Sequence, residues 1–214
     1  MSISINSGSV NNNGINKTSA QYKAVVRDSM ASILQSEAMM SDEERLIYET
    51  FGGRDRIIQN KMKMYDSSGR MINGFGVAGM DATGIPISQR HKIINISEEA
   101  KQNMFNETLR HFKQENGIAN GDTTRRSEVF KKYQLSVPIE DRLKGTWTLE
   151  QYEKAYRQAF YDACKNADPK WELGKDIPVG ALDGLTRESI DNSLVKGNSE
   201  YGETLTRKTV DISV

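Results

Sequence analysis

The sequence contains few of the residues that most often carry out chemistry in proteins. Its 214 residues include one cysteine, Cys164, and two histidines, His91 and His111. One cysteine cannot form a disulfide within the chain, so the fold must be stabilised by packing. No grouping of cysteine and histidine has the spacing of a zinc site, and no short motif joins a nucleophile to a base. The sequence therefore predicts neither a bound metal nor a cofactor.

Long apolar runs are also missing, and neither sign of charge is in excess. No stretch approaches the roughly 18 consecutive apolar residues of a membrane-spanning helix, so we expect no membrane insertion. Lysine and arginine together number 29, as do aspartate and glutamate, which gives a net charge of zero. A balanced chain has no overall field to attract nucleic acid. The mean hydropathy of −0.64 is typical of a soluble, polar protein.

The first 17 residues consist almost wholly of serine, asparagine, glycine and isoleucine. Such a stretch buries too little apolar surface to offset its ordering entropy, so we predict a flexible polar tail over residues 1–17. It has neither the basic cluster nor the apolar core of a secretory signal peptide. Its composition resembles the uncleaved N-termini used by flagellar-type export routes. We therefore expect a bacterial protein that is cytoplasmic, or exported without a cleavable signal peptide.

Most of the remaining chain has the apolar spacing of amphipathic helices. The predicted fold is mainly α, with about six amphipathic helices. Side chains suited to capping mark helix starts at Ser19, Ser41, Ser97, Thr148 and Thr186. The helix from Thr148 carries a continuous aromatic face and is the most clearly specified of them.

The helix expected from Ser41 has a distinct apolar side. Ser41 and Glu44 have the spacing of a capping box, in which each side chain accepts a hydrogen bond from the other residue's backbone. Leu46, Ile47 and Phe51 form the apolar side. We expect this side to pack against the preceding helix as one half of an antiparallel pair.

A glycine-rich segment interrupts the helical pattern in the middle of the chain. Asp66-Ser-Ser-Gly69 and Asp81-Ala-Thr-Gly84 are turn sequences, and residues 91–96 have the composition of a strand. We therefore expect a minor β-hairpin or meander near residues 70–96. Gly74-Phe-Gly76-Val-Ala-Gly79 has the glycine spacing of a dinucleotide site, but the residues that follow cannot begin the helix that such a site requires.

These signals divide the chain into halves joined by a polar loop at residues 118–127. The predicted parts are a flexible tail (1–17), a helical half with the glycine-rich β or loop insert (18–117), a second helical half whose last helix ends at Gly197 (127–197), and a polar tail (198–214).

The leading functional prediction is a non-catalytic protein that acts through protein–protein contacts, as an assembly component, an adaptor or an exported accessory factor. The expected partner is another protein or a second copy of the chain. Seven of the nine methionines lie between positions 30 and 80. Flexible thioethers suit a surface that adapts to a partner, and they equally suit an imperfectly packed core. The side chains predicted to contact the partner are Met39, Met40, Phe75, Trp147 and Trp171.

Two alternatives stay open from the sequence. One is an enzyme whose site lies between the halves, around Asp66, Asp81, His91 and His111; three of these in one pocket would support it. The other is a weak nucleic-acid binder, because small basic clusters occur along the chain. These clusters lie at residues 54–63, 125–126 and 131–132.

Overall fold

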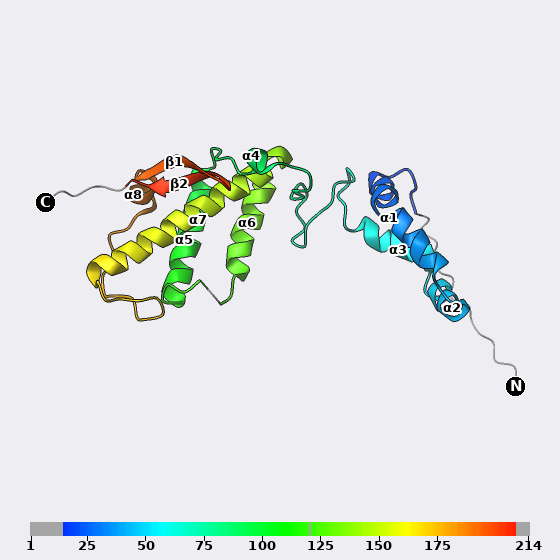
Figure 1. Cartoon of the computed structure of the whole chain (residues 1–214), viewed down its shortest axis with the longest axis horizontal. Coiled ribbons are helices and arrows are strands. Elements are labelled where there is room, and N and C mark those ends of the chain that lie inside the picture. Colours follow the sequence, from blue (N-terminus) through cyan, green and yellow to red (C-terminus); the bar gives the residue numbers. More distant parts are fainter. Residues whose placement is uncertain (1–14, 120, 209–214) are drawn as a thin grey trace, which may run out of the picture. The chain divides into compact units, whose positions relative to one another are not determined.

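The computed structural model describes residues 15–119 and 121–208, which form eight helices and one two-stranded antiparallel sheet (Figure 1). The fold is therefore mainly α with a minor β-hairpin, as the sequence predicts. Two compact units divide the chain, an N-terminal unit (Met1–Asn73) and a C-terminal unit (Gly74–Val214). Most of the predicted tail over residues 1–17 lies outside the described residues.

The described part of the N-terminal unit contains helices α1 (Ala20–Ala38), α2 (Asp42–Thr50) and α3 (Gly53–Met62). Two of them begin at predicted caps. The Ser19 hydroxyl accepts a hydrogen bond from the Tyr22 amide, and Ser41 and Glu44 form the expected capping box. Because these caps are interactions within one turn, they can be predicted from the local sequence.

The small core of the N-terminal unit lies between α1 and α3. Its buried apolar residues are Ala24, Val25, Ile33, Ile58 and Tyr65. The sequence predicts that the first two helices form an antiparallel pair. The structure corrects this prediction, since α3 rather than α2 packs along α1. Helix α2 contributes no buried residue to the core.

The C-terminal unit contains five helices and the hairpin. Its elements are α4 (Ile87–Arg90), α5 (Glu98–Gln114), α6 (Thr124–Ser136), α7 (Ile139–Ala167), α8 (Arg187–Asp191), β1 (Leu194–Ser199) and β2 (Gly202–Arg207). Helix α7 packs against α5, α6, α8 and β2 (Figure 1). The aromatic side chains of α5 and α7 form the centre of the core, where Phe112 and Phe160 meet edge to face at 5.6 Å.

Helix α7 is longer than the sequence predicts. It begins after Pro138, not at Thr148, and Thr148 lies fully buried within it. The Thr148 hydroxyl donates to the carbonyl of Lys144 and accepts from the amide of Ile94 at 3.0 Å. A side chain that looks like a local cap therefore makes a tertiary contact.

The β-structure lies elsewhere than expected. Among the described residues, positions 70–96 contribute isolated bridge residues at Met71, Ile72 and Ala78, while the sheet pairs Leu194–Ser199 with Gly202–Arg207. The helix expected to end at Gly197 stops at Asp191, and part of the expected polar tail over 198–214 forms β2. The expected strand over 91–96 has no regular secondary structure. It is bonded to β2 through Glu203, whose amide lies 2.9 Å from the His91 carbonyl oxygen and whose carboxylate accepts from the Ile93 amide at 2.6 Å.

The division into units also differs from the predicted halves. The chain divides between Asn73 and Gly74, whereas the sequence predicts a boundary at 118–127. In the structure, this loop connects α5 to α6, and both helices contribute to one hydrophobic core. A polar loop marks a domain boundary only if few contacts cross it, which is not the case here.

A close approach of α6 and α7 occurs at Gly145, and it generates the first prediction. A Cβ atom at this position would lie 2.6 Å from Cζ of Tyr133. Alanine favours a helix by about 1 kcal/mol over glycine, but overpacking costs about 1–3 kcal/mol. We expect Gly145→Ala to lower the free energy of unfolding, as measured by urea denaturation followed through tryptophan fluorescence.

The matched control is Gly184→Ala, because nothing lies within 4 Å of a Cβ atom there. Both tryptophans belong to the C-terminal unit, so their fluorescence reports its unfolding. A Gly145→Ala protein as stable as the control would show that the two helices do not approach closely.

Candidate interaction surface

Helix α2 exposes its apolar side chains. Leu46 is 70% exposed, Ile47 52% and Phe51 62%, and Met39 in the preceding loop is 78% exposed. The sequence predicts that the first three lie on a buried side, and the structure corrects that prediction. These four residues are called the α2 surface. Large apolar side chains exposed together are a feature of interaction sites.

The carboxylate of Glu37 explains why α2 is held with this side outward. Glu37, at the end of α1, is 8% exposed. Its Oε1 accepts hydrogen bonds from the Tyr48 hydroxyl at 2.6 Å and from Nε of Arg54 at 2.9 Å, and Arg54 also pairs with Oε2. Arg45 donates to the backbone carbonyl of Glu37 at 2.8 Å. Thus polar contacts from Tyr48 and Arg45 turn one side of α2 toward α1.

The electrostatics of this group favour the ionised carboxylate. The hydrogen bonds from Arg54 and Tyr48 lower the pKa of Glu37 from its ordinary 4.5 to about 2. Burial, together with the nearby Glu37 charge, raises the pKa of Tyr48 to about 12. Tyr48 is therefore a neutral phenol and Glu37 a charged carboxylate between about pH 2 and about pH 12. The bonds that join Glu37 to Arg45, Tyr48 and Arg54, here called the Glu37 cluster, stay intact over this range.

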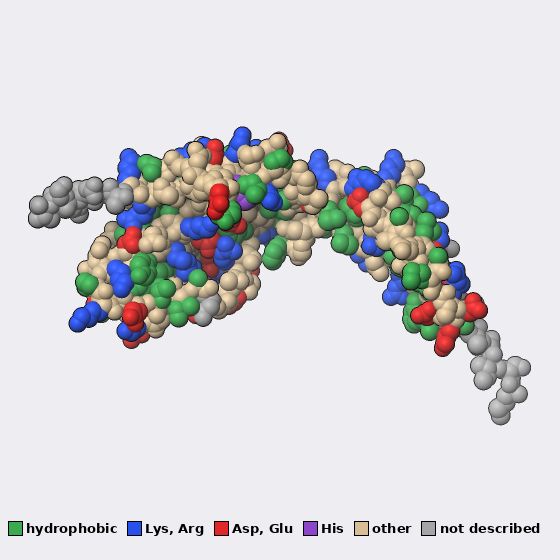
Figure 2. Space-filling view, viewed as in Figure 1, with side chains coloured by type: hydrophobic (Ala, Val, Ile, Leu, Met, Phe, Trp, Pro, Cys, Tyr) green, Lys and Arg blue, Asp and Glu red, His purple; other side chains and the backbone are tan. Residues whose placement is uncertain are grey.

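The apolar side chains of α2 lie next to acidic ones. Ile47 and Phe51 are one turn apart and so are neighbours along the helix. The first turn of α2 carries Asp42, Glu43 and Glu44, which suit the positive end of the helix dipole. Figure 2 shows hydrophobic and acidic side chains gathered at the end of the N-terminal unit that carries α2. The surface is therefore apolar with an acidic border.

The five predicted contact residues have different surroundings. Met39 belongs to the α2 surface, and Met40 beside it is half-buried. Phe75 is 56% exposed in the C-terminal unit. Trp147 is half-buried and stacks on His91, with ring centroids 3.9 Å apart.

Trp171 is the one of the five that cannot lie on an accessible surface. It is buried in the core of the C-terminal unit, and its indole N–H donates to the carbonyls of Lys175 and Asp176, each at 3.1 Å. The sequence marks Trp171 as an apolar anchor within a loop but does not show that α7 and α5 cover it.

The residues of the enzyme hypothesis make separate local contacts. Asp66 belongs to the N-terminal unit and accepts from the amides of its own turn, as Asp81 does from the Thr83 amide in the C-terminal unit. His91 contacts Trp147 of α7, while His111 lies 3.1 Å from an Arg157 nitrogen. These two contact points on α7 are ten residues, or about 15 Å, apart along the helix.

Metal ligation and thiol chemistry have no support in the described residues. No group of three or more histidine, cysteine, aspartate or glutamate side chains within them could hold a metal ion. Cys164 is fully buried in the C-terminal core, and burial raises the pKa of its thiol. A thiol in such surroundings is a poor nucleophile, because the thiolate is the reactive form.

Each of the three basic clusters contributes at least one cation to an ion pair. Arg54 pairs with Glu37, Arg126 pairs with Glu153 through two bonds of 2.7 Å, and Lys132 pairs with Glu99 at 2.7 Å. These acidic partners reduce the positive charge that each cluster could offer to a phosphate backbone.

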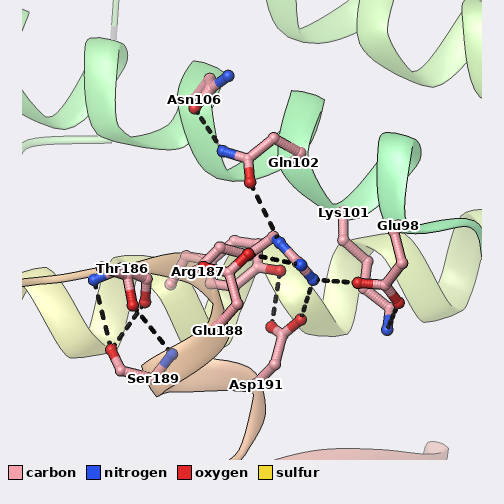
Figure 3. A network of polar contacts seen from close by, with 10 residues as sticks. Glu98, Lys101, Gln102, Asn106, Thr186, Arg187, Glu188, Ser189 and Asp191 are labelled. Carbon is pink, nitrogen blue, oxygen red and sulfur yellow. Dashed lines mark hydrogen bonds and ion pairs between the residues drawn. The ribbon is translucent and has the colours of Figure 1, made fainter.

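A polar network around Arg187 joins α8 to the start of α5 (Figure 3). The Arg187 side chain is 10% exposed and pairs with Glu98 and Asp191, each at 2.6 Å. It also donates to Gln102 of α5 at 3.2 Å. Because its charge is matched by several carboxylates, we interpret this network as a structural clamp.

The chain belongs to a protein family. A model of the family described as "Domain of unknown function (DUF3879)" matches residues 15–214, which is nearly the whole chain. Searches of curated proteins and of solved structures found no match. Among the described residues, no helix is both long enough and apolar enough to cross a membrane.

The Glu37 cluster generates the second prediction. Since folding lowers the pKa of Glu37, its contribution to stability is complete above pH 4.5 and is lost as pH falls toward 2. We expect Glu37→Gln to weaken α2 attachment already at neutral pH and to remove part of that acid dependence. The attachment of α2 at each pH is measured by the hydrogen-exchange protection of peptides covering residues 41–51, corrected for the intrinsic exchange rate at that pH.

Glu43→Gln is the matched control, because Glu43 is an exposed carboxylate of the same region. It should leave the exchange of α2 close to that of the unaltered chain. Equal protection in the Glu37→Gln and Glu43→Gln proteins would show that the buried carboxylate does not hold α2.

Proposed function

We propose that this protein is non-catalytic and acts through protein–protein contacts made by the α2 surface. The observation that carries the proposal is the exposure of Met39, Leu46, Ile47 and Phe51 around a helix that is held in place by polar bonds to Glu37. In a bacterial cell, the protein would serve as an assembly component, an adaptor or an exported accessory factor. It would act in the cytoplasm, or after export without a cleavable signal peptide.

The chemistry of the surface supports this proposal. Methionine and phenylalanine are enriched at the centres of protein interfaces, where their burial supplies binding energy. Exposing Leu46 and Phe51 to water is unfavourable, and a partner that covers them recovers about 25 cal/mol for each Å² of apolar area buried. Fixing α2 through Tyr48 and Arg45 before binding reduces the ordering entropy that association costs.

The enzyme alternative has less support. Of its four residues, the two histidines contact α7 about 15 Å apart along its axis, and the aspartates each bond to their own turns. A nucleic-acid role has less support too, because the basic clusters contain ion-paired cations.

The third prediction tests the α2 surface directly. A photo-activatable phenylalanine analogue placed at Leu46 should cross-link one defined protein, or a second copy of the chain, in cells of the source organism. We expect the double variant Leu46→Glu, Phe51→Glu to weaken the association by about tenfold or more, as for central apolar contacts at interfaces. Sedimentation velocity of the purified chain separates self-association from binding of another protein.

Val179→Glu is the control, since Val179 is a fully exposed apolar residue of the C-terminal unit. It introduces the same charge without touching the α2 surface. The proposal fails if the double variant forms the same cross-links and complexes as the control, or if the analogue at Leu46 captures nothing reproducible.

A further inference from the structure

A groove runs between α7 and β2 in the C-terminal unit. Its volume is about 730 Å³, within the range of about 300–1,000 Å³ of small-ligand pockets. One wall is the stretch of α7 from Lys154 to Asn166, and the other is the end of β2 from Leu205 to Arg207 together with Lys208, which follows the strand. The hairpin lies alongside α7 in Figure 1.

The lining of this groove is strongly basic. Lys154, Lys165, Arg207 and Lys208 contribute four positive charges, and Asp162 contributes one negative charge that is paired with Arg207 at 2.6 Å. This excess stands out in a chain whose total charge is zero. No described carboxylate forms an ion pair with any of the three lysines. The groove therefore has the charge to attract an acidic ligand.

The outer edge of β2 lies open along the groove. In an antiparallel pair, successive residues point their backbone groups alternately toward and away from the partner strand. The Glu203 amide bonds outward to His91, which sets the outward positions at Glu203, Leu205 and Arg207. No described residue hydrogen-bonds to the backbone groups of Leu205 or Arg207. These groups can accept an added strand.

The hairpin is fixed in place at the other end of β2. The Trp147 indole donates to the Glu203 carbonyl at 2.7 Å, and the His91 ring stacks on Trp147 and bonds to the Tyr201 carbonyl at 2.6 Å. Gly202 permits this approach, because it has φ +114° and a Cβ there would lie 2.7 Å from the His91 carbonyl oxygen. The open edge is therefore held ready before a ligand arrives.

We infer that the α7–β2 groove binds an acidic segment of a partner protein in an extended conformation, which adds to β2 as a third strand. Backbone bonds to Leu205 and Arg207 would give the strand its position. The three lysines would select acidic side chains. At about 3.3 Å per residue, the four residues from Leu205 to Lys208 set a length of about 13 Å for the bound segment.

A peptide fits the groove better than single-stranded nucleic acid does. Nucleic acid sites of that kind combine positive charge with aromatic side chains on which bases stack. The lining residues of this groove include no aromatic side chain. The open strand edge is specific to a polypeptide ligand, since only a peptide backbone offers matching donors and acceptors.

This inference goes beyond the proposed function and does not depend on it. The α2 surface belongs to the N-terminal unit and the groove to the C-terminal unit. Variants at Leu46 and Phe51 therefore test one proposal, while variants at the groove test the other.

The fourth prediction uses a fluorescein-labelled hexapeptide of alternating glutamate and valine, with its lysine–valine counterpart as the control peptide. Fluorescence anisotropy with the full chain should show binding of the acidic peptide alone, weakening as salt increases. We expect Lys154→Glu combined with Lys208→Glu to weaken binding by about tenfold or more. Binding of an oligothymidine in preference to the acidic peptide would overturn the inference.

The strand-addition geometry has a separate test. Leu205→Pro removes an outward N–H without removing a bond to β1 and should abolish peptide binding. Asn198→Pro is the matched control, because it removes an outward N–H from the opposite edge of the hairpin and should leave binding unchanged.

The folding of both proline variants is checked by circular dichroism, and the backbone amides that shift on peptide addition are identified by NMR. Shifts at Leu205 and Arg207 support the inference even if one variant is unstable. Shifts confined to other parts of the chain, or no binding at millimolar peptide, would overturn it.

Discussion

Phe105 of α5 meets Tyr156 and Phe160 of α7 edge to face, with ring centroids 5.4 and 5.6 Å apart. The C-terminal unit depends on this contact, because burial of the aromatic face fixes α7 against α5. Helix α7 has 29 residues, which makes it about 43 Å long. It provides the base on which α6, α8 and the hairpin pack. The groove beside β2 forms where the end of this strand lies along the stretch of α7 from Lys154 to Asn166.

The N-terminal unit is organised by charge more than by apolar burial. Its core contains five buried apolar residues, and none comes from α2. The position of α2 depends instead on the carboxylate of Glu37, which binds Tyr48 and Arg54. A buried carboxylate is favourable only when its oxygens are hydrogen-bonded, as they are here. This arrangement leaves the apolar side chains of α2 available for contact with a partner.

The sequence identified some parts of the candidate surface and missed others. The capping box at Ser41 follows from local sequence, and Met39 is among the contact residues that the sequence predicts. The exposure of Leu46 could not be predicted, because an amphipathic pattern shows which residues share a side of a helix and not which side is buried. The basic groove was missed for a related reason. Lys154 and Lys208 are far apart in the chain and come together only when β2 lies along α7.

The sequence by itself determined the mainly helical class and the starts of α1, α2, α5 and α8, because caps and apolar spacing act within about four residues. Tertiary structure alone decided where the sheet forms, which side of α2 faces outward and which helices share a core. Those features depend on contacts between distant residues, such as Arg54 with Glu37, 17 positions apart, and His91 with Tyr201, 110 positions apart. A local pattern carries no information about such pairs until the chain has folded.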